Sequence, residues 1–221
     1  MNSLKNPEVV AIIPFFNESG YVEHVIAATC DYVDLVIAVD DGSTDIYDHT
    51  VFESPKVILI KLGTNHGKGY ALNVGFKKSI ELNSHYTITL DADLQHPPEL
   101  IPQFISELHH ADIVIGARRK SATAMPPHRR LSNFLTTLLL SLKTGRKFDD
   151  SQSGYRGFKT GVLPGILPQS SGFEAETEIL INASENELLC SSIPIPTIYN
   201  DSVSKMQSIP AILGFIKVIL R

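Results

Sequence analysis

Short apolar runs alternate with segments of helical periodicity through the first half of the chain. Five of these runs are rich in Val and Ile, continuous rather than alternating, and bounded by polar residues or Gly, which is typical of strands buried on both faces. The five runs are Val9–Ile13, Leu35–Val39, Val57–Ile60, Tyr86–Leu90 and Ile113–Ile115. The alternation of strand and helix predicts an α/β fold with a mainly parallel sheet and right-handed crossovers.

Apolar stripes at helical spacing predict the helices that separate and follow these strands. Three stripes lie between strands, and a fourth follows PPHRR, a Pro-marked helix start. The stripes are Val22, Val25, Ile26 and Thr29; Ala71, Leu72, Gly75, Phe76 and Ile80; Leu100, Ile101, Phe104, Ile105 and Leu108; and Leu131, Phe134, Leu135, Leu138, Leu139 and Leu142. The final segment, Ser208–Arg221, is apolar around more than half of its circumference. It predicts a terminal amphipathic helix that docks on the core or, alternatively, lies in a membrane interface.

Length and composition fit one domain. A chain of 221 residues with 43% hydrophobic composition can bury the core of one α/β domain and is too short for two ordinary ones. Cys30 and Cys190 lie far apart without a CxxC partner, so neither a disulfide framework nor a zinc site is indicated, and a reducing compartment is expected. The first ten residues lack the features of a signal peptide, and no segment reaches ~18 apolar residues. We therefore expect a cytoplasmic location without a membrane span.

Charge is distributed unevenly along the chain. Residues 1–112 contain 6 Lys and Arg against 16 Asp and Glu, whereas residues 113–160 contain 10 against 2. A run of charge is often a solvated face, but a basic segment also suits an anionic ligand. The overall net charge of −5 argues against nucleic acid as that ligand.

Polar residues follow the carboxyl end of each predicted strand. Ligands of open parallel sheets bind outside these ends, so the five loops predict one binding site. The segments are PFFNE, with Glu18; DDGSTD, with Asp40 and Asp41; NHGKG; DADLQH; and GARR, with Arg118.

Asp91 and Asp93 come immediately after the fourth predicted strand. Side chains two residues apart on an extended chain point to the same side, so both carboxylates can reach one point. Two carboxylates placed so close together repel each other, and they need a shared proton or a bound cation. A hard divalent ion, Mg²⁺ or Mn²⁺, fits best because it takes oxygen ligands and binds substrate phosphates, and Gln95 can add an amide oxygen.

The segment NHGKGYALN places two glycines and Lys68 at a helix start. Such a start can hold phosphate, although this one matches neither the P-loop nor the dinucleotide-binding pattern, and a tight turn with a solvated Lys68 is the alternative. Asp40 and Asp41 also have two possible interpretations. They cap a helix that follows at Ser43–Thr44, or they contact the base or ribose of a ligand.

Basic residues beyond the strand ends are candidates for anion binding, because arginine recognises phosphate with two hydrogen bonds. They are Arg118, Arg119, Arg129, Arg130, Arg156, Lys159 and Lys205. Of the 8 histidines, only His96 lies beside the acidic pair, where a supporting role is expected. A Ser/His/Asp nucleophile is not indicated, because no G-x-S-x-G segment occurs.

Six segments together resemble the family 2 glycosyltransferases of the GT-A fold, and among them the dolichyl-phosphate mannose synthase-like branch. They are VVAIIPFFNE, VIAVDDGSTD, NHGKGYALNVGF, TLDADLQHPPE, IGARR and DDSQSGYRGF. The resemblance implies a single Rossmann-like GT-A domain over residues 1–221, in which residues 1–116 bind a nucleotide sugar and a metal and residues 117–221 bind the acceptor. It also implies that a hexose is transferred with inversion from a donor of the GDP-mannose or UDP-glucose type, with Mg²⁺ or Mn²⁺ as cofactor.

The resemblance implies roles for individual residues. The donor residues are Pro14, Phe16 and Glu18 at the nucleoside, Asp40 and Asp41 at the base and ribose, and Lys68, Asp91 and Arg118. The metal residues are Asp91, Asp93 and Gln95. The acceptor residues are Arg129, Arg130, Ser153, Arg156 and Lys205, and the catalytic candidates are Asp93, Arg118 and Arg130.

The acceptor is less determined than the donor. An acceptor phosphate is already anionic and needs no strong base, whereas the hydroxyl of a sugar or glycolipid does. Arginines dominate the region in which hydroxyl-transferring members carry an acidic pair, which favours a polyprenyl or dolichyl phosphate reached by a peripheral protein at the membrane surface. Against this, Asn200 and Ser202 stand where the branch often has Arg and Gly.

Other activities stay open as alternatives. A hydroxyl acceptor would call for a carboxylate base, for which the candidates are Asp149, Asp150, Glu174 and Glu176. A nucleotide-sugar-binding module without catalysis would have little need of the acidic pair. A nucleotidyltransferase would be expected to carry a basic residue in the loop that reads PFFNESG.

Overall fold

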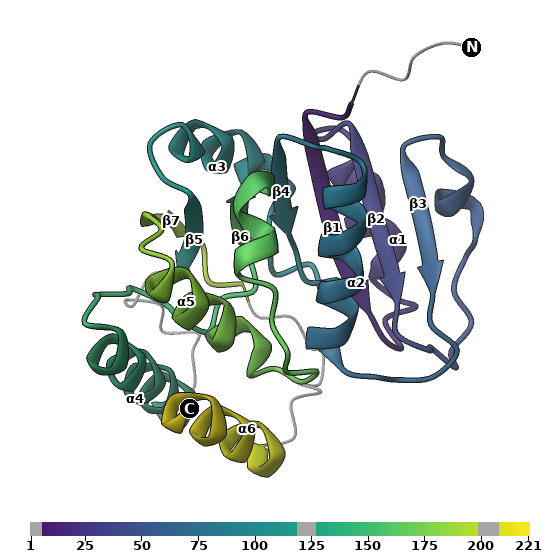
Figure 1. Cartoon of the computed structure of the whole chain (residues 1–221). Helices are drawn as coiled ribbons and strands as arrows, with labels where there is room; N and C mark the ends of the chain where they lie inside the picture. The colour runs from purple at the N-terminus through teal and green to yellow at the C-terminus, as the bar shows by residue number, and fades with distance from the viewer. Residues whose placement is uncertain (1–5, 119–126, 199–207) are drawn as a thin grey trace.

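One sheet forms the centre of the molecule in the computed structural model. The structure describes residues 6–118, 127–198 and 208–221, and within these ranges it describes all side chains except those of residues 127–132 and 208–211. The strands in this part of the chain are β1 (Val9–Phe15), β2 (Leu35–Asp40), β3 (Val57–Lys61), β4 (Tyr86–Thr89), β5 (Ile113–Arg118), β6 (Arg156–Lys159) and β7 (Cys190–Ile195). They are ordered β3-β2-β1-β4-β6-β5-β7 (Figure 1).

The sheet is mainly parallel, as predicted. The exception is β6, which runs antiparallel between β4 and β5, while the other neighbouring strands pair in parallel. The five predicted runs correspond to β1 to β5. The sequence did not indicate β6 and β7, because RGFK is short and charged and CSSIPI contains a proline and two serines, so neither has the apolar continuity of a buried strand.

Helices cover both faces of the sheet (Figure 1). They are α1 (Val22–Thr29), α2 (Lys68–Glu81), α3 (Ile101–Leu108), α4 (Pro127–Thr144), α5 (Ala175–Glu185) and α6 (Ser208–Leu220), with short 3-10 segments at Thr50–Glu53, Pro98–Leu100 and Thr160–Gly165. Alternate residues of β1 point to opposite faces. Ala11 and Ile13 belong to the core that includes α1 and α3, whereas Val10 and Ile12 belong to the core that includes α2 and α5.

Helices α4 and α6 pack outside α5, at one end of the molecule (Figure 1). The predicted stripe on α4 does form one face of a helix, but Phe134, Leu135, Leu138, Leu139 and Leu142 are exposed. Among the described side chains of α4, residues 133–144, the one that belongs to the core is Leu140. Within the described residues, no helix combines the length and the hydropathy needed to cross a membrane.

Candidate functional site

The loops at the carboxyl ends of the strands bring together a lysine and two carboxylates. Lys68 is the first residue of α2, and the preceding Gly67 has φ 98°, a conformation that favours glycine. The Lys68 Nζ lies 2.6 Å from Asp91 Oδ1, in the loop after β4, and 2.8 Å from Glu176 Oε1, in the first turn of α5. Lys68 is thus a half-buried counterion shared by two carboxylates, which rules out the alternative of a solvated Lys68, while its contact with a donor phosphate stays a prediction.

The charges of this cluster stabilise one another. Burial alone would raise the pKa of Asp91, but Lys68 and, to a smaller extent, His96 outweigh it and lower that pKa to about 2. Burial would likewise lower the pKa of Lys68, but Asp91 and Glu176 raise it above its usual value. Asp91 and Lys68 are therefore both ionised at neutral pH.

Asp93 lies in a tight turn directly after Asp91. Its Oδ1 accepts a hydrogen bond from the backbone N–H of Gln95 at 3.0 Å, and Leu94 between them has φ 61°. Burial and the neighbouring Asp91 carboxylate raise the pKa of Asp93. An elevated pKa on one of two adjacent acids indicates that added positive charge would stabilise the pair.

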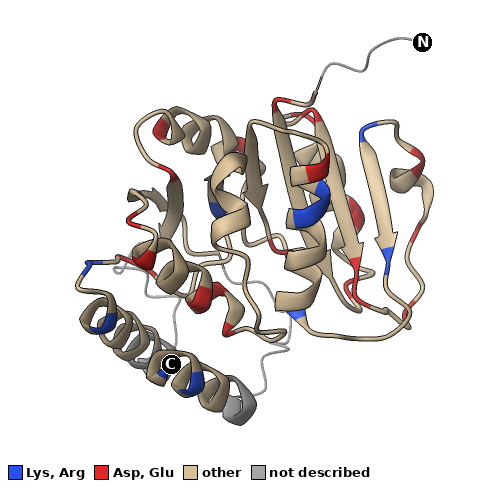
Figure 2. Ribbon diagram, viewed as in Figure 1, with Lys and Arg blue, Asp and Glu red and all other residues tan. Residues whose placement is uncertain are grey.

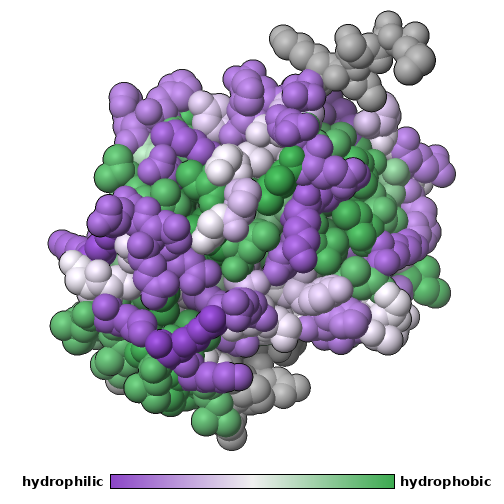
Figure 3. Space-filling view, in the orientation of Figure 1, coloured by the Kyte–Doolittle hydropathy of each residue, from purple (hydrophilic) through white to green (hydrophobic). Residues whose placement is uncertain are grey.

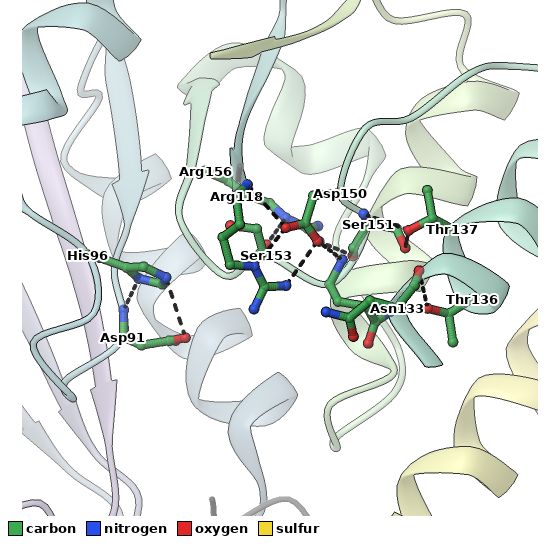
Figure 4. Close-up of polar contacts among 11 residues, drawn as sticks. Asp91, His96, Arg118, Asn133, Thr136, Thr137, Asp150, Ser151, Ser153 and Arg156 are labelled. Carbon is green, nitrogen blue, oxygen red and sulfur yellow. Dashed lines mark hydrogen bonds and ion pairs between the residues drawn. The ribbon is translucent and has the colours of Figure 1, made fainter. Parts of the chain in front are cut away.

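His96 supports the acidic loop. Its Nδ1 accepts a hydrogen bond from the backbone N–H of Asp91 at 3.0 Å, so the neutral ring carries its proton on Nε2, which lies 4.0 Å from Asp91 Oδ2 (Figure 4). The ring stacks on Tyr155 with 5.0 Å between centroids. Burial lowers the pKa of His96 and favours the neutral ring. His96 therefore supports the backbone beside Asp91, in agreement with the supporting role that the sequence indicated.

Arg118 is the last residue of β5. Its guanidinium donates to both carboxylate oxygens of Asp150, from Nε at 2.7 Å and from Nη2 at 3.0 Å (Figure 4). Such a two-bond pair fixes the plane of the guanidinium. Arg118 and Asp91 line one pocket, whose other walls are formed by Gln95, His96, Gln152, Gly154, Ile195, Pro196 and Ile198.

The acidic loop fits a divalent cation that is completed by a substrate. Asp91, Asp93 and the amide of Gln95 offer only oxygen ligands, the set that Mg²⁺ and Mn²⁺ prefer. A Cβ at Gly154 would lie 2.8 Å from Asp91 Oδ2, so glycine keeps the space beside this carboxylate open. In the part of the chain that the structure describes, no group of three His, Cys, Asp or Glu side chains is arranged to hold a metal by itself. A cation here would therefore depend on phosphate oxygens for part of its coordination.

The predicted nucleoside residues line the same edge of the sheet. Pro14 is buried in β1, and Phe16 and Glu18 are half-buried in the loop after it. Asp40 accepts hydrogen bonds from the Ser43 N–H and the Tyr47 hydroxyl, at 2.8 and 2.6 Å.

Asp41 has a structural role that the sequence did not indicate. Its two oxygens accept hydrogen bonds from the N–H groups of His66 and Gly67, each at 2.8 Å. Asp41 thereby anchors the loop that delivers Lys68 to the acidic cluster.

Arg156 requires a correction among the predicted acceptor residues. It is 1% exposed, and its guanidinium donates to the backbone carbonyls of Ser153, Glu176 and Ser151 at 2.9, 2.6 and 2.9 Å. The guanidinium holds the loop before β6 against α5, and because it is buried it is not accessible to an acceptor phosphate.

The other acceptor predictions stay predictions. Ser153 is buried, and its Oγ has no hydrogen-bond partner among the described atoms. The side chains of Arg129 and Arg130, and the whole of Arg119, Asn200, Ser202 and Lys205, lie outside the described residues.

The fold and the acidic sheet edge define a glycosyltransferase domain of the GT-A type. The model of the Glycosyl transferase family 2 matches residues 10–166, and the chain belongs to this family. A relative from Methanococcus voltae, a UDP-N-acetylglucosamine–dolichyl-phosphate N-acetylglucosaminyltransferase, is 32% identical over 94% of this chain and 92% of its own. An undecaprenyl-phosphate mannosyltransferase from Micrococcus luteus is 29% identical over 72% of this chain and 69% of its own.

Solved structures confirm the fold. Glucosyl-3-phosphoglycerate synthase from Mycobacterium tuberculosis, crystallised with Mn²⁺, uridine diphosphate and phosphoglyceric acid, superposes with a TM-score of 0.74. The match covers 96% of this chain and 78% of that one at 17% identity. At that identity the likeness concerns the fold alone.

Proposed function

We propose that this glycosyltransferase moves a sugar from a nucleoside-diphosphate sugar to a polyprenyl phosphate, with inversion at the anomeric carbon. The observation that carries the proposal is the pocket in which Asp91 faces Arg118, because it pairs a cation-binding acid with a phosphate-binding guanidinium. The names of the two relatives, both of which act on polyprenyl phosphates, support the acceptor class.

The reaction is a direct displacement. An oxygen of the acceptor phosphate forms the new bond to the anomeric carbon, and the bond to the donor diphosphate breaks with its electron pair on the diphosphate. A divalent cation held by Asp91, Asp93 and Gln95 would supply positive charge to the leaving group. Arg118 supplies hydrogen-bond donors in a plane that Asp150 has already fixed, so little reorientation is needed when charge develops.

The ion pairs of two candidate bases favour a phosphate acceptor over a hydroxyl. A hydroxyl acceptor needs a base that lies close to the anomeric carbon and is placed to accept the hydroxyl proton. Two of the four candidate bases, Asp150 and Glu176, are instead bound by the cations of Arg118 and Lys68. A third, Asp149, is an exposed residue that accepts a hydrogen bond from the Ser192 hydroxyl at 2.5 Å.

The donor is proposed at the level of a nucleoside-diphosphate hexose or N-acetylhexosamine. The relative from Methanococcus voltae bears the name of a UDP-N-acetylglucosamine enzyme. The residues proposed at the base and ribose, Asp40 and Asp41, do not distinguish GDP-mannose from UDP-glucose. UDP-N-acetylglucosamine, UDP-glucose and GDP-mannose are therefore the donors to test first.

The test is nucleoside-diphosphate release from these three donors with Mn²⁺, in the presence of a polyprenyl phosphate or of the free polyprenol of equal chain length. We expect one donor to be turned over, to give a sugar-linked lipid, only with the phosphate. Turnover with the polyprenol, or with a glycolipid but not the phosphate, would overturn the acceptor assignment.

A further inference from the structure

An apolar surface extends over α4 and α6 at one end of the molecule. In Figure 3 it is the green area at the lower left, over the place of these two helices in Figure 1. We call it the α4–α6 face; its exposed large side chains are Phe134, Leu135, Leu138, Leu139, Leu142, Ile212, Leu213, Ile216 and Leu220. Clusters of this size on a protein surface mark interaction sites.

The orientation of α4 is the reverse of that of an ordinary surface helix. Several polar side chains of α4 face the protein: the Thr137 hydroxyl lies 2.9 Å from the Ser151 hydroxyl, and the Ser141 hydroxyl accepts a hydrogen bond from the Phe148 N–H at 3.4 Å. The leucines face outward. An amphipathic helix in water buries its apolar side, so this arrangement indicates that something apolar covers the outer side.

Helix α6 has the same exposed spacing as α4. Ile212, Leu213, Ile216 and Leu220 repeat the positions i, i+1, i+4 and i+8, while Phe215 and Val218 pack inward. The predicted docking of the final segment on the core is thus confirmed for one side of α6, and the other side remains exposed.

Charges around the α4–α6 face are positive. The sequences of α4 and α6 contain no Asp or Glu, although the chain as a whole has a net charge of −5. Lys143, Lys147 and Lys217 are exposed around the apolar side chains, and blue segments at the lower left of Figure 2 mark this end. Three acids lie beside these helices. Glu178 of α5 is buried and bound by Arg221 at 3.0 Å, Glu185 of α5 lines a small pocket together with Lys143, and Glu174, just before α5, has its carboxylate against Gly214 of α6.

We propose that the α4–α6 face seats the protein on an anionic lipid bilayer, with the apolar side chains in the acyl boundary and the lysines at the headgroups. An apolar helix face rimmed by basic residues has the chemistry of a helix that lies in the membrane interface. A second copy of this chain fits less well, because face-to-face packing would bring the same lysines together.

The α4–α6 face is connected to the pocket through few contacts. Thr137 of α4 touches Ser151, the neighbour of Asp150, and Asp150 fixes the guanidinium of Arg118 (Figure 4). Seating α4 on a bilayer therefore holds the pocket near the surface from which a lipid phosphate projects. This consequence rests on the proposed function, whereas the membrane contact itself does not.

Vesicle sedimentation tests the membrane contact without any substrate. The full chain is mixed with vesicles of phosphatidylcholine and phosphatidylglycerol that contain no polyprenyl phosphate. The double variant Leu142→Gln/Leu213→Gln is compared with Leu189→Gln, because Leu142, Leu213 and Leu189 are 71%, 62% and 63% exposed and Leu189 lies outside both helices. We expect the double variant to bind about tenfold more weakly and the control to match the wild type.

Two further measurements test what the lysines contribute to vesicle binding and what the leucines contribute to sugar transfer. Lys143→Gln/Lys217→Gln should weaken binding to the anionic vesicles but not to pure phosphatidylcholine. The leucine variant should retain turnover of a water-soluble, short-chain polyprenyl phosphate and lose turnover of a long-chain one embedded in vesicles. If the sugar-transfer proposal fails, vesicle binding persists.

Two outcomes would overturn the membrane proposal. One is equal vesicle binding by the wild type and the leucine double variant. The other is a wild-type dimer in light scattering that the double variant dissociates, without vesicle binding by either, which would assign the α4–α6 face to a second copy.

Discussion

The Lys68 ammonium lies 2.6 Å from the Asp91 carboxylate and also binds Glu176, so this structure holds a positive charge beside the acidic pair. Lys68 is 17% and Asp91 27% exposed, and charges so far removed from water depend on each other. The same carboxylate is the one proposed to bind a divalent cation. Lysine and cation therefore compete for Asp91.

Replacing Lys68 should make the protein less stable and more responsive to metal. Lys68→Met leaves Asp91 and Glu176 without their shared cation, and we expect the free energy of unfolding to fall by about 3 kcal/mol. Mn²⁺ should raise the melting temperature of this variant more than that of the wild type, because the metal replaces the lost charge. Lys78→Met is the control, since Lys78 is on the same helix and binds Glu81 outside the site. Equal Mn²⁺ shifts in Lys68→Met and wild type would contradict the competition.

The stabilisation from this ion pair should have an acidic and an alkaline limit. The pKa of Asp91 is lowered to about 2 in the folded protein, so its contribution is complete above the unfolded pKa near 4 and is lost as the pH falls toward 2. The pKa of Lys68 is raised, so its contribution is complete below the unfolded pKa near 10 and is lost at higher pH. Urea unfolding of wild type and Lys68→Met across pH should show the largest difference between these limits. A constant difference down to the acid limit would contradict this assignment.

Asp93 should be needed for the metal-dependent reaction. Asp93→Asn removes a charge from a pair whose repulsion favours a cation, and we expect kcat/KM with Mn²⁺ to fall by about 10² to 10³. Chelation of divalent ions should abolish the wild-type reaction. The matched control is Glu99→Gln, an exposed acid a few residues further on, which should stay within about twofold of wild type. Isothermal titration with Mn²⁺ and nucleoside diphosphate gives a reading that is independent of turnover, and undiminished Mn²⁺ binding by Asp93→Asn would refute the assignment.

Asp150 should act by orienting Arg118 rather than as a base. In Asp150→Asn the amide can accept only one of the two hydrogen bonds that fix the guanidinium, and we expect kcat/KM to fall by about 10- to 100-fold. The pH profile of the remaining activity should keep its wild-type shape, because no proton acceptor has been removed. Asp149→Asn serves as the exposed neighbouring control. A profile that loses its acidic limb in Asp150→Asn would instead identify a general base.

Arg156 should affect stability and not acceptor binding. Arg156→Lys keeps the charge, but its single nitrogen cannot take the places of the three guanidinium nitrogens that bind the three backbone carbonyls. We therefore expect a loss of about 2 kcal/mol or more in urea unfolding. At a temperature where the variant is folded, the KM for the acceptor phosphate should be unchanged. A raised acceptor KM without a loss of stability would restore the role that the sequence indicated.

Local spacing along the chain was sufficient for much of the fold and part of the site. Continuous apolar runs of three to five residues predicted β1 to β5, because strands buried on both faces have no polar side to alternate with. The position of Asp91 and Asp93 after β4 followed from the same pattern, since the carboxyl ends of parallel strands meet at one edge. These features depend on residues close together in the sequence.

The tertiary structure decided which partners the polar groups found. Lys68 and Glu176 are more than a hundred residues apart, and they meet only because α2 and α5 pack on the same face of the sheet. Arg156 looked like a surface cation, but three converging backbone carbonyls make its buried position favourable.

The sequence by itself determined where β1 to β5, α1 to α4 and α6 form, because each of these elements is specified by the periodicity or apolar continuity of its own side chains, whereas β6, β7 and α5 lack such a signal. It also determined that α4 has one apolar side. Only the tertiary structure decided that this side faces outward, because the direction in which a helix turns its apolar side depends on the surfaces around it. The hydroxyls of Thr137 and Ser141 found partners on the protein, and the leucines were left on the exposed side.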